Sequence, residues 1–196
     1  CRTEKACQYV LLHLPDQTLI YDTIGSQAAG EPLWATLDSG SGVAREQYRA
    51  RHLVWCYNQW TVGDPTGPAT GKLVSDVSSH YGERVAWEFG VPIIYMDGNG
   101  AIVHELELVA LTGRVALDVD PLIWTQYSPD GQTWSQERSA RAGKQGQRSQ
   151  RIAWRSQGKM AHWRTQRFRG DSDAHLSIAR LEAQIEPLFT KAFGRG

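Results

Sequence analysis

At 196 residues the chain is long enough to bury a substantial core, either as one large domain or as two small ones. Its 21 Lys and Arg residues balance 21 Asp and Glu residues, which excludes a generic polyanion-binding protein. Eight Trp and 19 Gly, together with frequent turn dipeptides, favour many short strands over long helices. We therefore expect an all-β protein.

The three cysteines, Cys1, Cys7 and Cys56, are odd in number and lack the Cys-x-x-Cys spacing of zinc sites. No apolar run approaches the roughly 18 residues needed to cross a bilayer, and no secretory signal opens the chain. These features predict a reducing compartment, no disulfide framework, no metal or cofactor and no membrane partner. Because the chain begins with Cys rather than Met and enters a strand pattern almost at once, we expect a fragment of a longer protein.

Short apolar runs separated by turns fill residues 1–82. Residues 7–15 and 18–22 predict a hairpin, and a loop rich in Gly, Ser and Ala follows them. Further strands are expected at 32–37, 48–57, 59–63 and 71–75, with turns at Asn58 and at 64–68. Strands this short with connections this regular resemble a repeating meander, such as one β-propeller blade and part of the next.

The residue pattern of the sequence changes between Tyr81 and Trp87, and we place the domain boundary after Gly82. Beyond it, strands at 91–95 and 101–111 flank Asp97-Gly-Asn-Gly100, which is a strong hairpin signal. Residues 83–196 are expected to form a β-sandwich-like C-terminal domain with basic strands.

The strand at 101–111 carries the pattern that indicates a sandwich. Leu106 and Leu108 alternate with Glu105 and Glu107, so one face of the strand is apolar and the other faces solvent. His104 shares the register of the leucines, and a satisfied sheet histidine is therefore a better interpretation than a metal ligand.

Residues 122–134 alternate and then turn back at Ser128-Pro-Asp-Gly131, which predicts a second hairpin. Pro129 presets φ for a type I turn, and Asp130 bonds locally. The segment resembles the Asp-box turn of sialidases but is one residue short of it, and that box is structural. A sialidase would also need an arginine trio around a carboxylate and a Tyr nucleophile, and nothing in the sequence fixes such a geometry.

The segment 136–170 holds 10 of the 21 Lys and Arg residues against the single acid Glu137. Within it, residues 139–150 are too charged to be core, and Gly158-Lys159 is expected to turn the chain into a strand at 163–169. A strand at 151–155 directs Ile152 and Trp154 to one face and arginines to the other. Those guanidinium groups either form a solvated face or meet phosphate or a neighbour's carboxylates.

The last segment, 176–188, fits both a helix and a strand, and its composition favours the helix. Asp118 with Asp120, and Asp171 with Asp173 and His175, could be imagined as metal ligands, but neither group has EF-hand spacing. Acids on solvated turns are the preferred interpretation. Without a phosphate loop, nucleophile elbow or His-Glu-x-x-His helix, the chain is predicted to be non-catalytic.

Taken together, the order and spacing of several motifs resemble the packaged-DNA stabilisation protein of short-tailed phages, the tail accessory factor that forms the tail hub. No single motif decides this, and the resemblance covers nearly the whole chain. The motifs are Tyr9-Val-Leu-Leu-His-Leu-Pro15, Leu19-Ile-Tyr-Asp22, Gly63-Asp64, Thr70-Gly-Lys-Leu73, Asp76-Val-Ser-Ser-His-Tyr-Gly82, Glu105-Leu-Glu107, Thr112-Gly113, the Ser128 turn, Arg151-Ile-Ala-Trp-Arg155, Gly158-Lys159 and Trp163 to Phe168.

The resemblance implies a non-enzymatic virion protein, assembled in the host cytoplasm, of which this chain is the C-terminal part. It implies a partial β-propeller followed by a β-sandwich, with a strand rather than a helix at 176–185. Several copies would form a ring in the phage tail below the portal and its adaptor ring. The ring would close the exit channel, retain packaged DNA and support the tail needle and the spikes or fibres, with DNA nearby in the channel.

We expect subunit contacts rather than DNA contacts from the basic strands, because they offer no helix to enter a groove. The alternative is a carbohydrate-binding β-sandwich for receptor recognition, with Trp60, Trp134 or Trp163 as sugar platforms. The candidate interface residues are Arg151, Arg155, Arg164, Arg167, Trp134 and Trp163.

Overall fold

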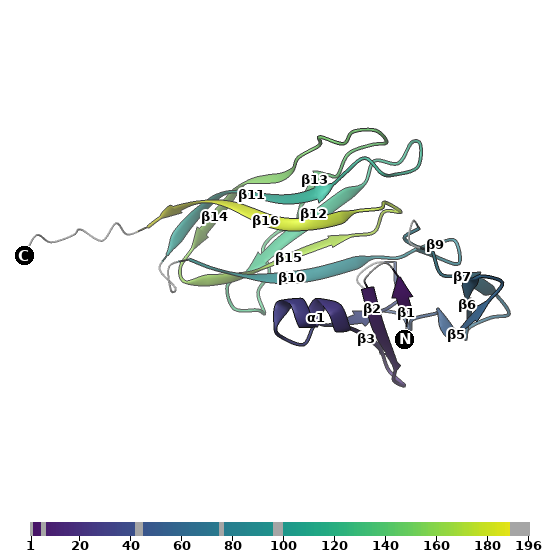
Figure 1. Cartoon of the computed structure of the whole chain (residues 1–196). Helices are drawn as coiled ribbons and strands as arrows, with labels where there is room; N and C mark the ends of the chain where they lie inside the picture. The colour runs from purple at the N-terminus through teal and green to yellow at the C-terminus, as the bar shows by residue number, and fades with distance from the viewer. Residues whose placement is uncertain (1, 5–6, 42–44, 75–76, 96–99, 189–196) are drawn as a thin grey trace, which may run out of the picture. The chain divides into compact units, whose positions relative to one another are not determined.

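The computed structural model describes residues 2–4, 7–41, 45–74, 77–95 and 100–188 (Figure 1). The chain divides into two compact units, Cys1–Val85 and Ala86–Gly196, built almost entirely of antiparallel strands. The division follows the hairpin of β8 (Ser79–His80) and β9 (Glu83–Arg84), and the expected boundary after Gly82 lies inside this hairpin. The all-β prediction is confirmed. Among the described residues, no helix has the length and apolar character to span a membrane.

Two meanders make up most of the first unit. The four strands of the first meander pair in the order β1-β2-β3-β4, and the three strands of the second pair in the order β5-β6-β7. Spatial order therefore follows chain order, as in a propeller blade and part of the next, and the predicted hairpin of β2 with β3 is confirmed. The strands are β1 (Arg2–Glu4), β2 (Cys7–His13), β3 (Thr18–Asp22), β4 (Trp34–Leu37), β5 (Arg51–Cys56), β6 (Gln59–Gly63) and β7 (Thr70–Lys72).

The predicted turn at Asn58 joins β5 to β6. Tyr57 and Asn58 both have positive φ, 51° and 57°, and Cys56 pairs with Gln59 across the ladder. Two consecutive left-handed residues define the type I′ turn, whose twist matches that of paired strands.

The loop expected after Asp22 is wrong in part, because residues Thr23–Ala29 form a short helix, α1. The Oδ1 atom of Asp22 accepts the N–H of Gly25 at 2.9 Å and caps the first turn. Gly30, with φ 75°, ends the helix and donates to the carbonyl oxygen of Ser26. The Gly, Ser and Ala composition concealed this local capping pattern.

A small core holds the first unit together. Tyr48, Ala50 and Val62 are buried, and Leu11 and Leu37 pack against them together with Leu53 and Tyr81. Because few apolar side chains are buried in this core, polar contacts carry more of the stability of the first unit.

The Arg49 side chain links the second meander to the hairpin of β8 and β9. Its Nε and Nη2 atoms donate to Asp64 Oδ2 at 3.0 and 2.7 Å, and its Nη1 atom donates to Glu83 at 2.7 Å. The guanidinium group also lies 5.1 Å from the ring centroid of Tyr81. Asp64 in turn accepts the N–H and the hydroxyl of Thr66, so one carboxylate orders the turn after β6 and holds Arg49.

The pH dependence of the first unit follows from Asp64. Hydrogen bonds from Arg49 and Thr66 lower the pKa of Asp64 from 3.8 to about 2. A carboxyl group with a depressed folded-state pKa stabilises the protein above its unfolded pKa and loses that effect as pH falls. As the pH is lowered from about 4 to about 2, we expect the urea concentration at the unfolding midpoint of the first unit to decrease. In the Asp64→Asn variant this pH dependence of the midpoint should be mostly lost. An unchanged slope in that variant would contradict the assignment.

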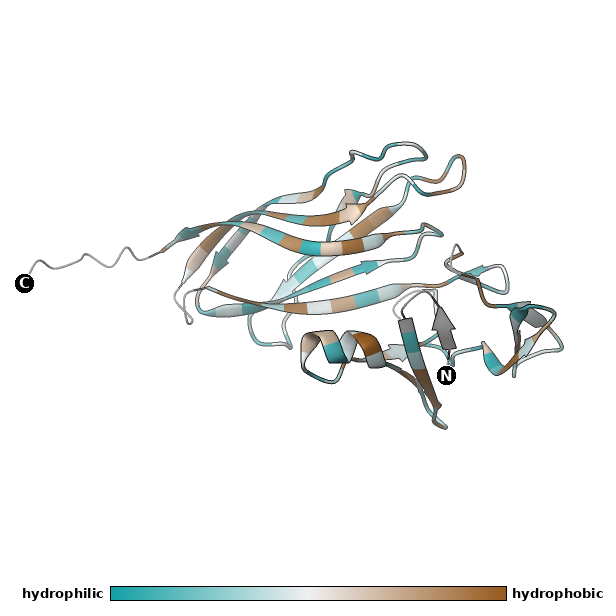
Figure 2. Cartoon of the chain, viewed as in Figure 1, coloured by the Kyte–Doolittle hydropathy of each residue, from teal (hydrophilic) through white to brown (hydrophobic). Residues whose placement is uncertain are grey.

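The second unit consists of two antiparallel sheets (Figure 1). One has the strand order β10-β15-β12-β13 and the other the order β14-β11-β16, and hydrophobic and hydrophilic residues alternate along several of these strands (Figure 2). The strands are β10 (Trp87–Ile94), β11 (Ala101–Leu111), β12 (Leu122–Ser128), β13 (Arg138–Arg141), β14 (Ile152–Met160), β15 (Trp163–Gly170) and β16 (Ser177–Pro187).

Inward-facing side chains of both sheets form one core. Leu106 and Trp154 come from one sheet and Ile123 and Phe168 from the other, and none of the four is more than 3% exposed. The ring centroid of Phe168 lies 5.5 Å from Trp154 and 5.3 Å from Phe89. Each buried side chain of this size contributes roughly 1.5–3 kcal/mol through the hydrophobic effect, so this core is the main source of stability in the unit.

One predicted hairpin and one predicted turn in this unit are wrong. The strands on either side of Asp97-Gly-Asn-Gly100 are not partners, since β10 pairs with β15 whereas β11 pairs with β14 and β16. Residues 96–99 themselves lie outside the described residues. Gly158 and Lys159 lie within β14, and the chain changes sheets at Ala161 and His162. Turn residues report a local reversal, but they do not report which sheet the next strand enters.

His104 is exposed, contrary to its predicted place beside the core leucines. His104 is an extra residue of β11 relative to β16, because Val103 pairs with Ile185 and Glu105 pairs with the next residue, Gln184. The pairing of β11 with β14 shifts at the same place. A bulge reverses which residues face inward, so Val103 and Leu106 are both buried and His104 points outward. There its Nε2 atom lies 2.8 Å from Glu186, as part of a satisfied sheet histidine.

The strand implied by the family resemblance at 176–185 is confirmed, and the composition-based helix is wrong. β16 pairs with β11 along its whole length, from Leu111 with Ser177 to Ala101 with Pro187. Without β16 this side of β11 would be an open sheet edge, and tertiary pairing overrides local propensity.

The segment 139–150, predicted to lie outside the core, contributes to it at its start. β13 pairs with β12, Ala140 packs against the core, and Ala142 is 2% exposed. Small apolar residues among charged ones are enough to form an edge strand.

Candidate functional site

The Ser128 turn is a hydrogen-bonded structural unit. The Oγ atom of Ser128 accepts the N–H of Gly131 at 2.8 Å, and Asp130 Oδ1 accepts the N–H groups of Gln132 and Thr133 at 2.8 and 2.7 Å. Ser128 also donates to Asp130 at 2.9 Å. The hairpin prediction is confirmed, although the return strand is β13 rather than residues 132–134.

Asp130 is expected to be the residue on which this turn depends. The N–H groups of Thr133 and Gln132 hold the pKa of its carboxyl group well below the ordinary value. In an Asp130→Ala variant the amides of Gln132 and Thr133 should exchange with solvent about tenfold faster, measured by hydrogen exchange. Asp130→Asn keeps the Oδ1 acceptor and is the matched control. Equal exchange in both variants would contradict this role.

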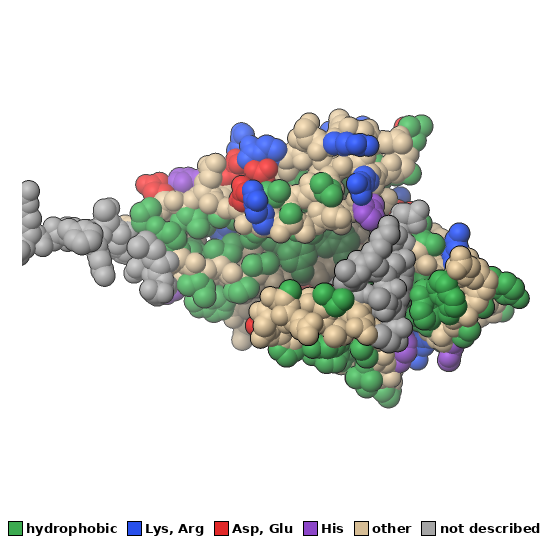
Figure 3. Space-filling view, viewed as in Figure 1, with side chains coloured by type: hydrophobic (Ala, Val, Ile, Leu, Met, Phe, Trp, Pro, Cys, Tyr) green, Lys and Arg blue, Asp and Glu red, His purple; other side chains and the backbone are tan. Residues whose placement is uncertain are grey.

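One sheet presents a face on which arginines pair with glutamates, here called the Arg–Glu face. Arg151 donates to Glu105 at 2.7 Å and also to Glu107, and Arg155 donates to Glu105 at 3.2 Å. Hydrogen bonds from Arg151 lower the pKa of Glu107. Figure 3 shows positive and negative side chains side by side on the second unit. The predicted alternation is confirmed, since Ile152 and Trp154 are buried and both arginines are exposed.

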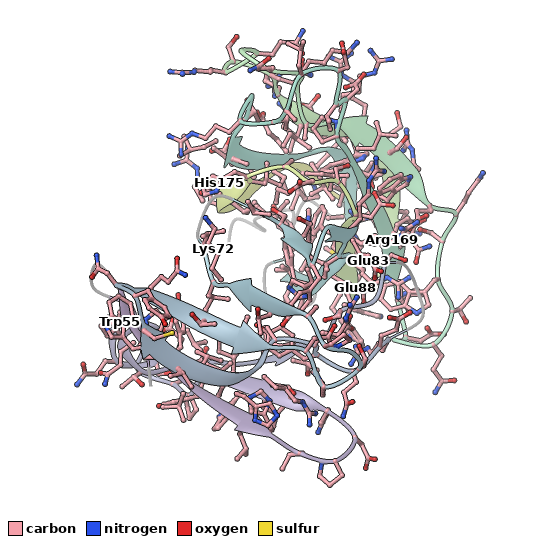
Figure 4. The ribbon with its side chains drawn as sticks, turned by 90° about the vertical axis from the view of Figure 1, so that its right-hand side faces the viewer. Trp55, Lys72, Glu83, Glu88, Arg169 and His175 are labelled. Atoms are coloured by element: carbon pink, nitrogen blue, oxygen red, sulfur yellow. The ribbon has the colours of Figure 1, made fainter. Side chains whose placement is uncertain are left out.

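The other sheet presents a face where arginines stack on tryptophans, here called the Arg–Trp face. The guanidinium carbon of Arg167 lies 4.5 Å from the ring centroid of Trp134, and that of Arg169 lies 4.7 Å from Trp124. Glu137 accepts from Arg169 at 2.6 and 2.5 Å and raises its pKa. Glu88 lies opposite Arg169 in the backbone ladder of β10 and β15 (Figure 4).

Sequence reasoning missed the Arg169 pair. The signal for it was Glu137, the single acid of the basic segment, because an isolated acid among cations is expected to find a partner. Stacking of arginine on aromatic rings orders these side chains and leaves less entropy to lose on binding.

Arg164 does not belong to either exposed face, and its assignment to an interface needs correction. On β15 it alternates with Trp163 and points inward, where only 1% of it is exposed. The prediction treated Arg164 as an interface residue, but Arg164 shares the register of the core residue Phe168. The other five candidates lie on the surface or partly buried, and their interface role stays a prediction.

The three tryptophans considered as sugar platforms differ in access. Trp134 is covered on one face by Arg167, and Trp60 packs edge-on against Trp55 at 5.3 Å. Trp163 is 43% exposed. Trp55, on β5 of the first unit, is also exposed (Figure 4). Trp60 belongs to the first unit, whereas Trp134 and Trp163 belong to the second.

Within the described ranges, no three His, Cys, Asp or Glu side chains gather as metal ligands. Asp120 instead lies 3.6 Å from Arg141. Cys56 is a free thiol, with its Sγ atom 3.1 Å from the hydroxyl of Thr61. The polar clusters described above are therefore arranged as structural pairs and surface faces.

Both all-β units match described families of known proteins. Residues 86–186 match the family described as "Bacteriophage P22 Gp10, beta-sandwich", and residues 1–78 match "Bacteriophage P22 Gp10, beta-propeller". The sandwich match covers more than half of the chain, and the chain belongs to the P22 Gp10 family. The family predicted from motif order is thus confirmed.

One curated relative is the tail hub protein gp10 of Salmonella phage P22, which is 28% identical over 179 residues. The alignment covers 91% of this chain and 36% of the relative. The chain therefore spans about a third of that protein's length.

Proposed function

We propose that the chain is part of a tail hub subunit in a phage particle, where it is a structural component and not an enzyme. Membership of the P22 Gp10 family over both units is the observation that carries this proposal. The similar P22 protein is named a tail hub protein. The proposal extends to the finer role, in which a ring of such subunits closes the portal channel, retains packaged DNA and supports the needle and the spikes or fibres.

The construction of the second unit suits a load-bearing element. Long antiparallel ladders such as β11 with β16 and β10 with β15 satisfy backbone groups internally. Arg138 of β13 donates to the carbonyl oxygens of Arg155 and Ser156 in β14 at 2.6 and 3.0 Å, which joins the edges of the two sheets. A unit built in this way deforms little when neighbouring subunits bind, and this favours a fixed relative position of the subunits in a ring.

The two arginine faces are the surfaces that we assign to neighbouring subunits. On the Arg–Glu face, the side chain of Arg155 is 82% exposed and has donors beyond its contact with Glu105. On the Arg–Trp face, Arg167 and Trp134 form a stacked pair with Trp163 on the same sheet. Arginine and tryptophan are enriched at protein interfaces, where they provide much of the binding energy.

Charge reversal tests the Arg–Glu face. The double variant Arg151→Glu and Arg155→Glu, made in the full-length subunit, is expected to reduce incorporation into particles by about tenfold or more, measured by quantitative mass spectrometry of purified virions. The control is Arg148→Glu, an exposed loop arginine with the same change of charge per substituted residue.

A charge swap separates assembly from folding. Adding Glu105→Arg and Glu107→Arg to the double variant restores opposite charges within the face. The charge at each of the four positions is still the reverse of the natural one. We expect folding to recover and incorporation to remain low. Full recovery of incorporation would mean that Arg151 and Arg155 serve their own sheet alone, and the interface assignment would be withdrawn.

A further inference from the structure

The sheet β14-β11-β16 ends in a long edge strand, β16. Among the described residues no strand pairs with its second side, here called the free edge, and most of its residues are exposed (Figure 1). Other outer strands are protected, since β10 contains Pro92 and the short strand β13 is joined to β14 through Arg138. β16 has no proline before Pro187. Its free edge is therefore a template for a further strand.

Alternate residues of β16 turn their backbone groups toward the free edge. Leu188 donates its N–H to the carbonyl oxygen of Gly100, the residue before β11, at 3.0 Å. Residues two apart in a strand turn the same way, and β16 is regular from Arg180 to Glu186 because the extra residue there belongs to β11. The residues that turn their N–H and C=O groups to the free edge are therefore Leu181, Ala183 and Ile185.

The two faces of this regular stretch differ in character (Figure 2). Leu181 and Ile185 pack against the sandwich core but stay partly exposed. Arg180, Glu182 and Glu186 lie on the opposite face, because side chains alternate along a strand. The side chains of Arg180 and Glu186 are 69% and 63% exposed, so each is open to a further partner. A strand that pairs with the free edge must match both faces.

We propose that the free edge of β16 binds the same edge of a second copy of this chain, in an antiparallel register centred at Ala183. In this register Arg180 of one copy lies opposite Glu186 of the other, and Leu181 lies opposite Ile185. The two-fold axis repeats each contact, so opposite charges and apolar side chains face each other twice. The backbone groups that turn to the free edge exchange hydrogen bonds between the copies.

The neighbouring registers are less favourable. A register centred one residue earlier places Glu182 opposite itself, and one centred one residue later places it opposite Glu186, so like charges meet. A register centred two residues earlier extends into the start of β16, where the pairing with β11 is irregular. A register centred two residues later places Ala183 opposite Pro187, which has no N–H to donate. The edge is thus complementary to itself in the register centred at Ala183.

The pair goes beyond the proposed function. A two-fold contact uses the same surface on both copies and closes on itself, so it forms a pair of subunits and not a ring. It joins two sheets into one continuous sheet and covers both free edges, which prevents unspecific addition of other strands. The Arg–Glu and Arg–Trp faces are side-chain surfaces and are distinct from this backbone edge.

Sedimentation equilibrium of the full chain tests the pair. We expect the mass to rise from one copy to two as the concentration is raised to about 1 mM. Hydrogen exchange at the same concentrations locates the contact. The amides of Leu181, Ala183 and Ile185 should become protected as the pair forms, whereas those of Glu182 and Gln184, which turn to β11, should not change.

Charge variants test the register. Glu186→Arg places like charges opposite Arg180 twice in each pair and should weaken the pair about tenfold. Adding Arg180→Glu restores opposite charges and should restore the pair. Glu182→Arg is the matched control, because it has the same change of charge but lies opposite the neutral Gln184. A pair that Glu182→Arg weakens as much as Glu186→Arg would overturn the register.

A backbone variant tests the contact independently of charge. Ala183→Pro removes an N–H that turns to the free edge, and proline is tolerated on an edge strand in that orientation. The pair should weaken at least about tenfold; if this variant does not fold, the charge variants still decide. A mass of one copy at every concentration would overturn the proposal, as would a pair that neither Ala183→Pro nor Glu186→Arg weakens. The measurement uses the chain alone, so its outcome is independent of the proposed place in a phage tail.

Discussion

Replacing Phe168 by Ala should lower the free energy of unfolding of the second unit by about 3–5 kcal/mol. Phe168 is fully buried and touches the rings of both Trp154 and Phe89 at 5.5 and 5.3 Å. It therefore lies where the two sheets meet, and the cavity left by its truncation is surrounded by side chains of both. Urea unfolding, with hydrogen exchange of the β15 amides to assign the transition, measures the change.

Trp163→Ala is the matched control for this substitution. Trp163 is on the same strand but is 43% exposed, so its truncation removes a large ring without opening the core. We expect a loss of less than about 1 kcal/mol. Equal losses in the two variants would mean that the sandwich core is not where the unit derives its stability.

The second large effect is expected at Gly113. Its φ of 76° disfavours any side chain, and a Cβ atom there would meet the backbone of Gln147 at 2.9–3.0 Å. Strain of this backbone conformation costs about 1–3 kcal/mol, and collision with backbone atoms adds about 1–3 kcal/mol. Gly113→Val should therefore lower the free energy of unfolding by about 2–6 kcal/mol, measured as for Phe168.

Gly131→Val separates the two contributions. Gly131 has the same φ, 76°, but no atom lies within 4 Å of its Cβ position. This variant carries the strain without the collision, and we expect about 1–3 kcal/mol. If Gly113→Val were no more destabilising than Gly131→Val, the packing of the Gln147 loop on Gly113 would have no energetic weight.

Local alternation and turn chemistry predicted the strands better than their partners. The hairpin of β2 and β3 and the strand β6 follow from short apolar runs and adjacent turns, and both are confirmed. Pairing across distant segments is a tertiary property, and the strong turn signal at Asp97–Gly100 carries no information about it. β16 shows the same limit, because its sequence fits two periodicities and its neighbour β11 decides between them.

The arginine faces were predictable in part for a related reason. Alternation placed Arg151 and Arg155 outward, and both are exposed. The same logic treated Arg164 as a surface residue, since a charged side chain is seldom buried. Its register with Phe168 was the available signal, and it points inward. The position of His104 depends on the bulge in β11 at His104 itself, which no simple residue pattern predicts.

The proposed function needs a chain that acts through geometry, and the described strands offer ordered surfaces on paired sheets. Ion pairs such as Arg151 with Glu105 order the exposed side chains, and the Phe168 core fixes the sheets that carry them. In the proposed function, this order lowers the reorganisation needed when identical subunits bind one another.

Electron cryo-microscopy of the virus particle that contains the full-length subunit tests the central claim most directly. The account predicts a ring of identical subunits below the portal, with density that fits both the Cys1–Val85 and Ala86–Gly196 units. Particles with complete tails in which no density fits either unit would contradict it.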